Sequence, residues 1–298
     1  MASNLSYEVH HYAKDHELQR VGVWKTPDAT QGTTSPWVIY IHGGAWRDFR
    51  IDHTTFKPTI DAILSSSSGT KSSSSSPPPS SSPPIAGFAS IDYRLSPHPS
   101  FPQDPATTPA AAYRNASHPD HLDDVWSALA LLQRTYGFGG DYVLVGHSAG
   151  ATLALQLLMG SAAGAAPPPS SGVELPRAVV GLEGIYDLQG LVDRLGPAYA
   201  ELFIGAFGDA SHWAAVSPVR FAKSFRSGWE GGELVVLGWG PDDELIDGPE
   251  IEGMARRLDE DKVRTVVFKD LKGTHDGMWQ DGRPFAEVIL RTLGALSS

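Results

Sequence analysis

A serine flanked by two glycines lies near the middle of the chain, directly after a short apolar run. Residues 142–145 (YVLV) have the composition of a buried strand, and residues 146–150 (GHSAG) follow at once. The residues after them favour a helix, so we expect a strand–turn–helix unit. So tight a turn excludes side chains beside the serine, and its glycines leave the hydroxyl of Ser148 exposed as a nucleophile. The backbone N–H of Ala149 would then face a developing oxyanion.

A second glycine turn follows an earlier apolar run. Residues 37–41 (WVIYI) are continuously apolar, as in a central strand, and they lead directly into residues 42–47 (HGGAWR). Glycines allow backbone N–H groups to turn inward toward a substrate. The two turns together predict an oxyanion hole made by four backbone N–H groups, those of Gly43, Gly44, Ala45 and Ala149.

A serine hydroxyl is unreactive at neutral pH unless a base removes its proton, and the base needs an acid to orient it. His275 is the candidate base, because it follows the last predicted strand (265–268) and has no other histidine near it in the sequence. A nucleophile at the end of one strand and a base at the end of a later one meet at the same edge of a parallel sheet. We therefore expect Ser148 and His275 to act as a pair.

The acid should follow the strand predicted at residues 233–239, where Asp242, Asp243 and Asp247 compete. We favour Asp243, because acids in this loop are commonly followed two residues later by a short apolar pair, here Leu245 and Ile246. The spacing by itself leaves Asp242 open.

Residues 118–124 (HPDHLDD) combine two histidines with three aspartates, a composition that metal sites share. Apolar residues at helical spacing follow them, which favours the start of a helix with Asp120 as N-cap and acids in the first turn. We therefore expect a helix here, and no metal.

Strands and helices alternate along the whole chain, which predicts an α/β fold with a mostly parallel, doubly wound sheet flanked by helices. The length fits a single domain over residues 1–298. Residues 65–84 are almost entirely Ser and Pro and predict a disordered insertion. Residues 188–232 are irregular and aromatic, and they lie between two core strands, where we expect a small cap.

The composition excludes several classes of function. A net charge of −11 argues against binding nucleic acid or an anionic membrane surface, since both require basic patches. The absence of cysteine excludes disulfides and thiolate catalysis. We find no apolar run long enough for a membrane span and no leader segment at the N-terminus, so a cytoplasmic location is the expectation.

Several motifs together resemble one family. Residues 42–46 (HGGAW), 92–97 (DYRLSP) and 146–150 (GHSAG) resemble the hormone-sensitive-lipase-like branch of the α/β-hydrolases. Longer runs resemble the fungal kynurenine formamidases (arylformamidases), namely GVWKTPD (22–28), SFPQDP (100–105), HPDHLDDV (118–125), GLEGIYDL (181–188) and GTHDGMW (273–279). The resemblance covers nearly the whole chain except the Ser/Pro insertions.

This resemblance implies hydrolysis of N-formyl-L-kynurenine to L-kynurenine and formate, in tryptophan catabolism and de novo NAD synthesis. It implies a serine hydrolase without metal or cofactor, and members of the family are often homodimers. Trp46 would form a wall of the pocket for the aromatic leaving group, and Arg47 could meet the substrate carboxylate. The alternative is a carboxylesterase for short-chain or aryl esters, which would share every catalytic residue.

Overall fold

The computed structural model describes residues 5–25, 35–67, 85–164 and 172–297. Within these residues one sheet of eight strands runs through the molecule in the order β1-β2-β4-β3-β5-β6-β7-β8. The strands are β1 (Ser6–His11), β2 (Arg20–Lys25), β3 (Trp37–Ile41), β4 (Gly87–Ile91), β5 (Tyr142–His147), β6 (Ala178–Leu182), β7 (Leu234–Gly238) and β8 (Thr265–Phe268). The first two strands pair antiparallel, β2 also pairs antiparallel with β4, and the pairings from β4 to β8 are parallel. The predicted α/β fold with a mostly parallel sheet is confirmed.

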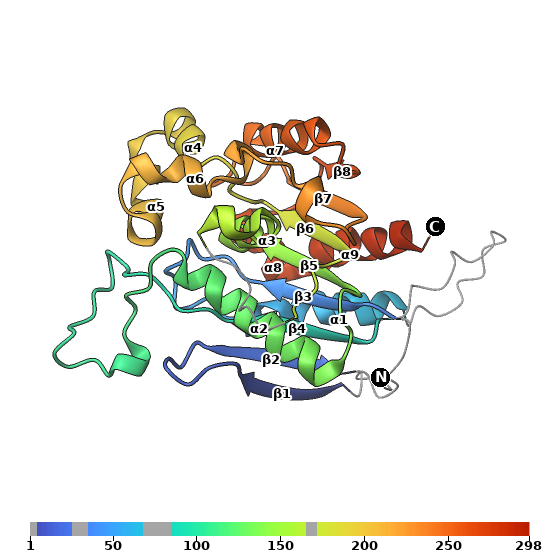
Figure 1. Cartoon of the computed structure of the whole chain (residues 1–298), viewed down its shortest axis with the longest axis horizontal. Helices are drawn as coiled ribbons and strands as arrows, with labels where there is room; N and C mark the ends of the chain where they lie inside the picture. Colours follow the sequence, from blue (N-terminus) through green and yellow to red (C-terminus); the bar gives the residue numbers. More distant parts are fainter. Residues whose placement is uncertain (1–4, 26–34, 68–84, 165–171, 298) are drawn as a thin grey trace.

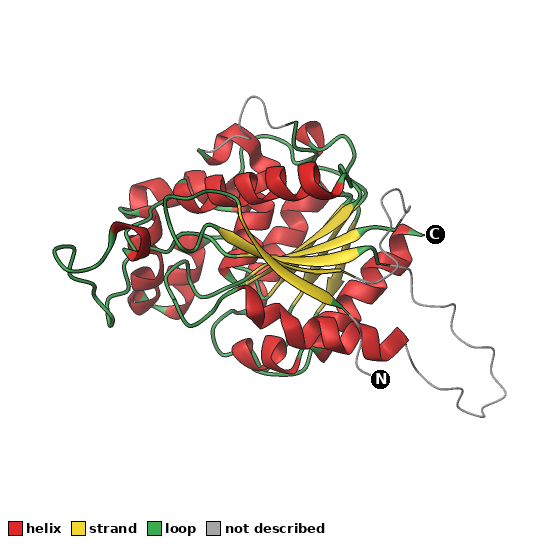
Figure 2. Ribbon diagram, turned by 90° about the horizontal axis from the view of Figure 1, so that it is seen from below, coloured by secondary structure: helices red, strands yellow, loops and turns green. Residues whose placement is uncertain are grey.

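The helices lie on both faces of the sheet (Figure 2). They are α1 (Lys57–Ser67), α2 (Asp120–Tyr136), α3 (Ala149–Met159), α4 (Leu188–Leu195), α5 (Ala200–Phe207), α6 (Trp213–Val216), α7 (Gly248–Glu260), α8 (His275–Asp281) and α9 (Arg283–Leu296). One buried apolar cluster joins one face of the sheet to α2, α3 and α7, and a second joins the other face to α1, α8 and α9. Because every strand from β3 to β7 is buried along its whole length, these strands read as continuous apolar runs in the sequence.

The parallel strands end in register. Ile41 pairs with Gly146, His147 with Leu182, and Leu182 with Gly238. The segments that follow β3, β5, β6 and β7 therefore emerge side by side at one edge of the sheet. This alignment brings residues separated by up to two hundred positions in the chain into one site.

Two of the predicted segments are partly or wholly described. Helix α1 continues through residue 67, so the first three residues of the stretch predicted as disordered (65–84) are helical, and residues 68–84 lie outside the described residues. Within the predicted cap (188–232), helices α4, α5 and α6 gather beyond one end of the strands, at the left of Figure 1. The division of the chain into domain, insertion and cap stays a prediction.

Helix α2 begins at Asp120, one residue earlier than it would with Asp120 as N-cap. The N-cap position belongs to Pro119, and the Asp120 carboxylate instead accepts a hydrogen bond of 3.0 Å from the backbone N–H of Ser117. The prediction of Asp120 as N-cap is therefore wrong, because the chain turns back at Ser117 and takes up that carboxylate before the helix. Acids do occupy the first turn, as predicted, with Asp120 and Asp123.

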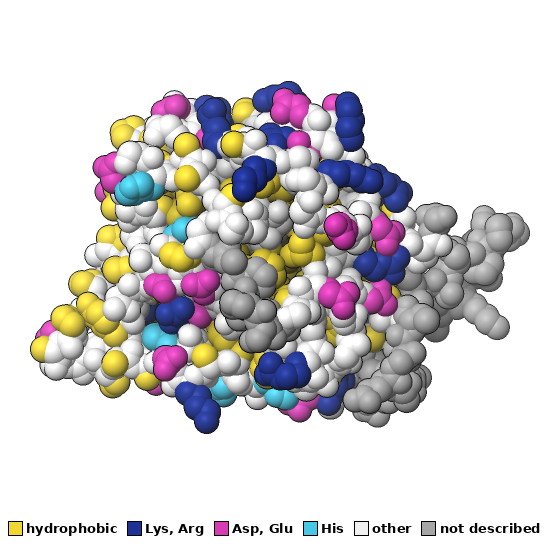
Figure 3. Space-filling model, viewed as in Figure 1, with side chains coloured by type: hydrophobic (Ala, Val, Ile, Leu, Met, Phe, Trp, Pro, Cys, Tyr) yellow, Lys and Arg dark blue, Asp and Glu magenta, His cyan; other side chains and the backbone are white. Residues whose placement is uncertain are grey.

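The surface carries charges of both signs. On the face seen in Figure 3, Lys and Arg side chains are interspersed with Asp and Glu, and hydrophobic side chains gather toward the left edge. The exposed large hydrophobic residues include Phe101, in the segment between β4 and α2, and Ile204 of α5, at 44% and 55% exposure. Every helix among the described residues is too short or too polar to cross a bilayer.

Candidate active site

Ser148 lies at the junction between β5 and α3 with a positive φ of 53°. Its backbone N–H donates to the carbonyl of Leu182 at the end of β6, and its carbonyl accepts from the N–H of Ala151 in the first turn of α3. Such a conformation costs a non-glycine residue about 1–3 kcal/mol, so the surrounding structure must enforce it. The predicted strand–turn–helix unit is present, with Ser148 at its tip.

The glycines beside Ser148 leave room for the backbone of neighbouring segments. A Cβ atom on Gly146 would lie 2.3 Å from the carbonyl oxygen of Gly150, and one on Gly150 would lie 2.1 Å from that of Ile41. The turn thus packs directly against the end of β3, with no space for a side chain.

We expect Gly150→Ala to lower the free energy of unfolding by about 3 kcal/mol or more, because the added methyl overlaps backbone that cannot move aside. Denaturant unfolding followed by circular dichroism measures this loss. Gly294→Ala in α9 is the matched control: its Cβ would meet no atom within 4 Å, so helix propensity should make it neutral or slightly stabilising. Equal unfolding midpoints for the two variants would contradict the close packing of the turn.

The turn after β3 is held by Tyr93. Its buried hydroxyl lies 3.1 Å from the carbonyl oxygen of His42 and 3.0 Å from that of Gly43. In a trans peptide the N–H points opposite to the carbonyl, so fixing these two oxygens also fixes the N–H groups of Gly43 and Gly44. The Gly43 Cα lies so close to the nucleophile that a Cβ there would be 3.0 Å from the Cβ of Ser148.

A buried cluster of charged and imidazole side chains, centred on Asp92, lies next to the turn after β3. Asp92, which follows β4, accepts from Arg20 Nε at 2.6 Å and lies 2.8 Å from Nδ1 of His53. His42 Nε2 lies 3.6 Å from the same carboxylate. Burial disfavours ionisation of Asp92, but the hydrogen bond with His53 and the nearby histidines outweigh it and lower the pKa. No role was predicted for Asp92 or Tyr93, although both lie in the DYRLSP run.

Trp46 and Arg47 extend from the turn toward α5. Trp46 is completely buried, and its ring packs edge-on against Phe203 and Phe207 of that helix. Arg47 donates from Nη1 to the carbonyl of Glu201 in α5. Arg47 also lines a hollow of about 370 Å³ between α5 and the segment after β4, whose other walls include Phe101, Gln103, Tyr113, Arg114 and Ile204. Trp46 does not line this hollow.

His275 and Asp243 lie against each other. His275 is the first residue of α8, and its Nδ1 is 3.1 Å from both carboxylate oxygens of Asp243. The Asp243 side chain is fully buried and also accepts from the N–H groups of Leu245 and Ile246. Burial opposes ionisation of Asp243, but these hydrogen bonds, that with His275 foremost, lower its pKa.

The two competing acids point elsewhere. Asp242 is exposed, and Asp247 forms a bidentate pair with Arg194 at 2.7 and 3.0 Å. Of the three candidates in this loop, Asp243 is therefore the one placed to orient His275.

Two residues that the sequence analysis did not assign lie beside His275. The ring of His147 is 4.6 Å from that of His275, and the Glu183 carboxylate lies 3.3 Å from His147 Nε2. Among the described residues, His147, Glu183 and His275 form the one set of three His, Asp or Glu side chains whose possible metal-ligand atoms all lie within 4.8 Å of each other. Within this group His147 and Glu183 are within hydrogen-bonding distance of each other, and the two imidazole rings are in contact. Sequence reasoning had one signal for Glu183, its position directly after a buried strand.

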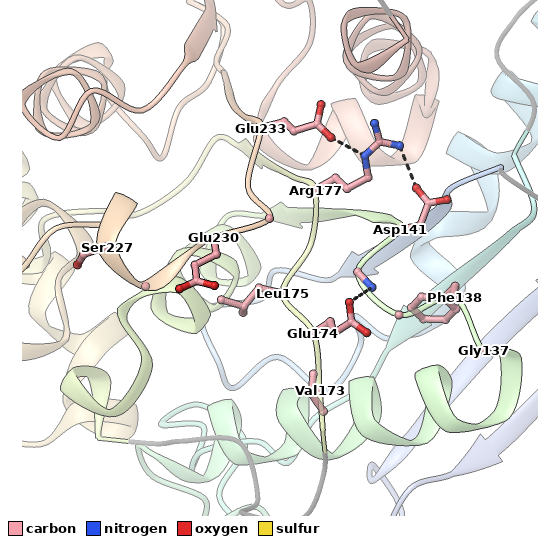
Figure 4. A pocket seen from close by; sticks show the side chains of 14 residues that line it. Gly137, Phe138, Asp141, Val173, Glu174, Leu175, Arg177, Ser227, Glu230 and Glu233 are labelled. Atoms are coloured by element: carbon pink, nitrogen blue, oxygen red, sulfur yellow. Dashed lines mark hydrogen bonds and ion pairs between the residues drawn. The ribbon is translucent and has the colours of Figure 1, made fainter.

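A second hollow lies at the opposite edge of the sheet (Figure 4). It measures about 1060 Å³ and is bordered by the segments that precede β5, β6 and β7. Arg177 pairs there with both Glu233 and Asp141, at 2.7 and 3.0 Å, and the Glu174 carboxylate accepts from the N–H of Gly140. Because its basic group is already paired and the nucleophile is at the other edge, this hollow is not part of the candidate active site.

Solved structures with the same architecture are esterases and lipases. Esterase B from Lactobacillus rhamnosis aligns with 99% of this chain and 86% of its own at a TM-score of 0.65 and 17% identity. A hormone-sensitive lipase from a metagenome library covers 99% of this chain and 87% of its own at a TM-score of 0.61 and 18% identity. Such low identity establishes the fold alone, and that fold is the α/β-hydrolase fold.

Sequence relatives are more specific. No family model matches the chain. It is 35% identical over 277 residues to a kynurenine formamidase-like hydrolase (fscH) from Fusarium equiseti, covering 90% of this chain and 85% of that protein. It is also 35% identical over 265 residues to the kynurenine formamidase avaC from Aspergillus versicolor, covering 82% and 84%. Since this similarity extends over nearly the whole length of both relatives, the chain belongs to the kynurenine formamidase family of α/β-hydrolases.

Proposed function

We propose that this protein hydrolyses N-formyl-L-kynurenine to L-kynurenine and formate, with Ser148, Asp243 and His275 as catalytic triad. The observation that carries the proposal is the pairing of the buried Asp243 carboxylate with His275 Nδ1 at 3.1 Å, at the edge of the sheet where Ser148 follows β5. An imidazole oriented in this way through Nδ1 presents Nε2 as a base. The names of the two relatives support the substrate.

The reaction begins with attack of Ser148 Oγ on the formyl carbon, while His275 Nε2 takes the hydroxyl proton. The carbonyl oxygen becomes an oxyanion, which the N–H groups of Gly43, Gly44, Ala45 and Ala149 stabilise. Positive φ angles at Gly44 and Ala45, 90° and 48°, are consistent with a turn built to present these groups.

Collapse of the tetrahedral intermediate breaks the C–N bond. His275 returns its proton to the departing aryl amine, which leaves as kynurenine, and Ser148 keeps the formyl group as an ester. A water molecule, deprotonated by His275, then attacks this ester and releases formate. Asp243 stabilises the imidazolium in both halves of the reaction.

The hollow beside Arg47 fits the leaving group of this substrate. Kynurenine carries a carboxylate and an aromatic ring, and the hollow offers the guanidinium groups of Arg47 and Arg114 next to Phe101 and Tyr113. Arg114 makes no ion pair with a carboxylate of the described residues, and its Nε is buried without a hydrogen-bond partner there. We assign Arg47 and Arg114 to the substrate carboxylate. Trp46, expected to form a wall of the pocket, is completely buried against α5, so we assign it to supporting the turn from which Arg47 extends.

Formate release from N-formyl-L-kynurenine, compared with hydrolysis of p-nitrophenyl acetate, tests the proposed function. We expect kcat/KM for the formamide to exceed that for the ester. A clear preference for the ester would favour the alternative, a carboxylesterase.

We expect Arg114→Met to raise KM for N-formyl-L-kynurenine about tenfold, the cost of one hydrogen bond to a charged group. The KM for p-nitrophenyl acetate should not change, because that substrate has no carboxylate. Arg50→Met is the matched control: Arg50 is an exposed arginine of the same region that already pairs with Asp48. Equal effects of both variants on both substrates would contradict the role of Arg114.

The proposed reaction places the protein in tryptophan catabolism and de novo NAD synthesis. A cytoplasmic location and a homodimer are part of the same proposal, and size-exclusion chromatography with light scattering tests the dimer.

A further inference from the structure

Glu183 is a carboxylic acid held at the centre of the candidate active site. It follows β6 directly, is completely buried, and has a positive φ of 49°. Its backbone N–H donates to the carbonyl of Gly238 at the end of β7, 2.8 Å away. A non-glycine residue in this conformation costs about 1–3 kcal/mol, and such strain concentrates at functional sites.

The neighbours of Glu183 restrict where its proton can lie. Its Oε2 is 3.3 Å from Nε2 of His147 and 3.9 Å from Nδ1 of His275. Its Oε1 is buried and accepts no hydrogen bond from the described residues. The Glu183 and Asp243 carboxyl groups both lie beside Nδ1 of His275, at 3.9 and 3.1 Å. Two buried carboxylates that share such a neighbour repel each other, so one of them carries a proton.

The charges around the two acids decide which of them is protonated. Burial, the Asp243 charge and the hydrogen bond to Asp243, then Glu244 and Asp276, raise the pKa of Glu183 to about 11. The hydrogen bonds to Asp243, from His275 and from two backbone N–H groups, lower the pKa of that carboxyl. His147, whose Nε2 lies 3.3 Å from Glu183, has a pKa well below its usual range, chiefly because it is buried, and is therefore neutral.

The geometry points to Glu183 as a positioning residue of the catalytic triad. As a neutral acid it donates a hydrogen bond to Asp243, while its other oxygen accepts one from His147. The Asp243 carboxylate is thereby held from three directions, by Glu183, by His275 and by the N–H groups of Leu245 and Ile246. Of the two carboxyl groups beside His275 Nδ1, only that of Asp243 then carries a negative charge. The inference rests on the proposed function, because it assigns Asp243 and His275 to the triad.

Two substitutions separate the role of the donor from that of the charge. Glu183→Gln keeps both shape and donor, and we expect its kcat to stay within about threefold of the wild type, with an unchanged acid limb in the kcat/KM profile. Glu183→Met fills a similar volume without a donor, and we expect kcat to fall about tenfold to a hundredfold with little change in KM, the effect of losing a hydrogen bond to a charged group.

Other results would overturn the inference. If Glu183 is ionised in the wild type, Glu183→Gln removes a negative charge near His275, and the acid limb of the profile moves to lower pH by about one unit. If Glu183 only fills space, the folded Gln and Met variants have equal kcat. Glu250→Gln is the matched control, since Glu250 is also buried but contacts Arg194 and the backbone of Tyr186 instead; its kcat should not change.

Thermal stability gives a readout that needs no turnover and so remains decisive if the proposed substrate is wrong. When folding raises the pKa of a carboxyl group, the folded protein becomes less stable as the pH rises above the pKa of that group in the unfolded chain. The unfolded chain then releases the proton, whereas the folded chain keeps it. Glu183→Gln removes this cost. We expect its Tm advantage over the wild type to grow between about pH 5 and about pH 8. A Tm difference that is independent of pH would show that Glu183 is ionised in the folded protein and overturn the inference.

Discussion

A Ser148→Ala variant is expected to fold normally and to lose about a millionfold in kcat, leaving only the residual rate that the oxyanion hole and binding supply. Ser148 is 5% exposed, and its substitution by alanine removes only the hydroxyl oxygen. Alanine and serine tolerate the positive φ equally, so the turn should keep its shape. Formate release measured with N-formyl-L-kynurenine, and circular dichroism of the same sample, check both halves of the expectation.

The control for this variant is Ser161→Ala, which changes an exposed serine just after α3 and should leave kcat unchanged. Folded Ser148→Ala protein that turns over substrate at more than about a thousandth of the wild-type rate would exclude Ser148 as nucleophile.

Asp243→Asn should lower kcat roughly ten-thousand-fold with unchanged folding. His275 Nδ1 lies 3.1 Å from the carboxylate, so Nδ1 must carry the proton and Nε2 is left as the base. An amide at position 243 can donate to Nδ1 and would favour the opposite tautomer, in which Nε2 is protonated and cannot accept from Ser148. The measurement is kcat/KM of the variant together with its Tm.

The same loop supplies two controls for Asp243→Asn. Asp242→Asn alters an exposed carboxylate and should change kcat/KM less than about twofold, since it makes no contact that strengthens in the transition state. Asp247→Asn weakens the pair with Arg194 and should lower stability rather than kcat. A large loss of activity in Asp242→Asn would mean that the loop moves and that Asp242 orients His275 during turnover.

The order of strands along the chain could be predicted where a strand is buried on both faces. The runs that became β3, β5 and β7 are almost entirely apolar, and their lengths match the strands within a residue or two. Strand β1 (SYEVHH) was not predicted. It lies at the edge of the sheet, it is largely exposed, and its mixed polar composition carries no signal.

The sequence by itself determines those parts of the candidate site that are formed by local turns. The two glycines around Ser148 are required by close backbone contacts, whereas Gly43 is required by the approach of His147 and Ser148, and Gly44 by its positive φ. The position of His275 after the last strand likewise indicated a base. The motifs therefore predict the nucleophile, the oxyanion turn and the base without any knowledge of tertiary contacts.

Only the tertiary structure shows that Asp243, and not Asp242, faces His275, and that Glu183 lies beside this pair. Adjacent residues of a loop point in different directions, and spacing cannot say which carboxylate faces His275. The surroundings of Glu183 come from the ends of β5 and β7 and from α8, segments that meet because the parallel strands end in register. A sequence determines local conformation through short-range sterics, but a pKa and an ion pair depend on neighbours that only the assembled sheet brings together.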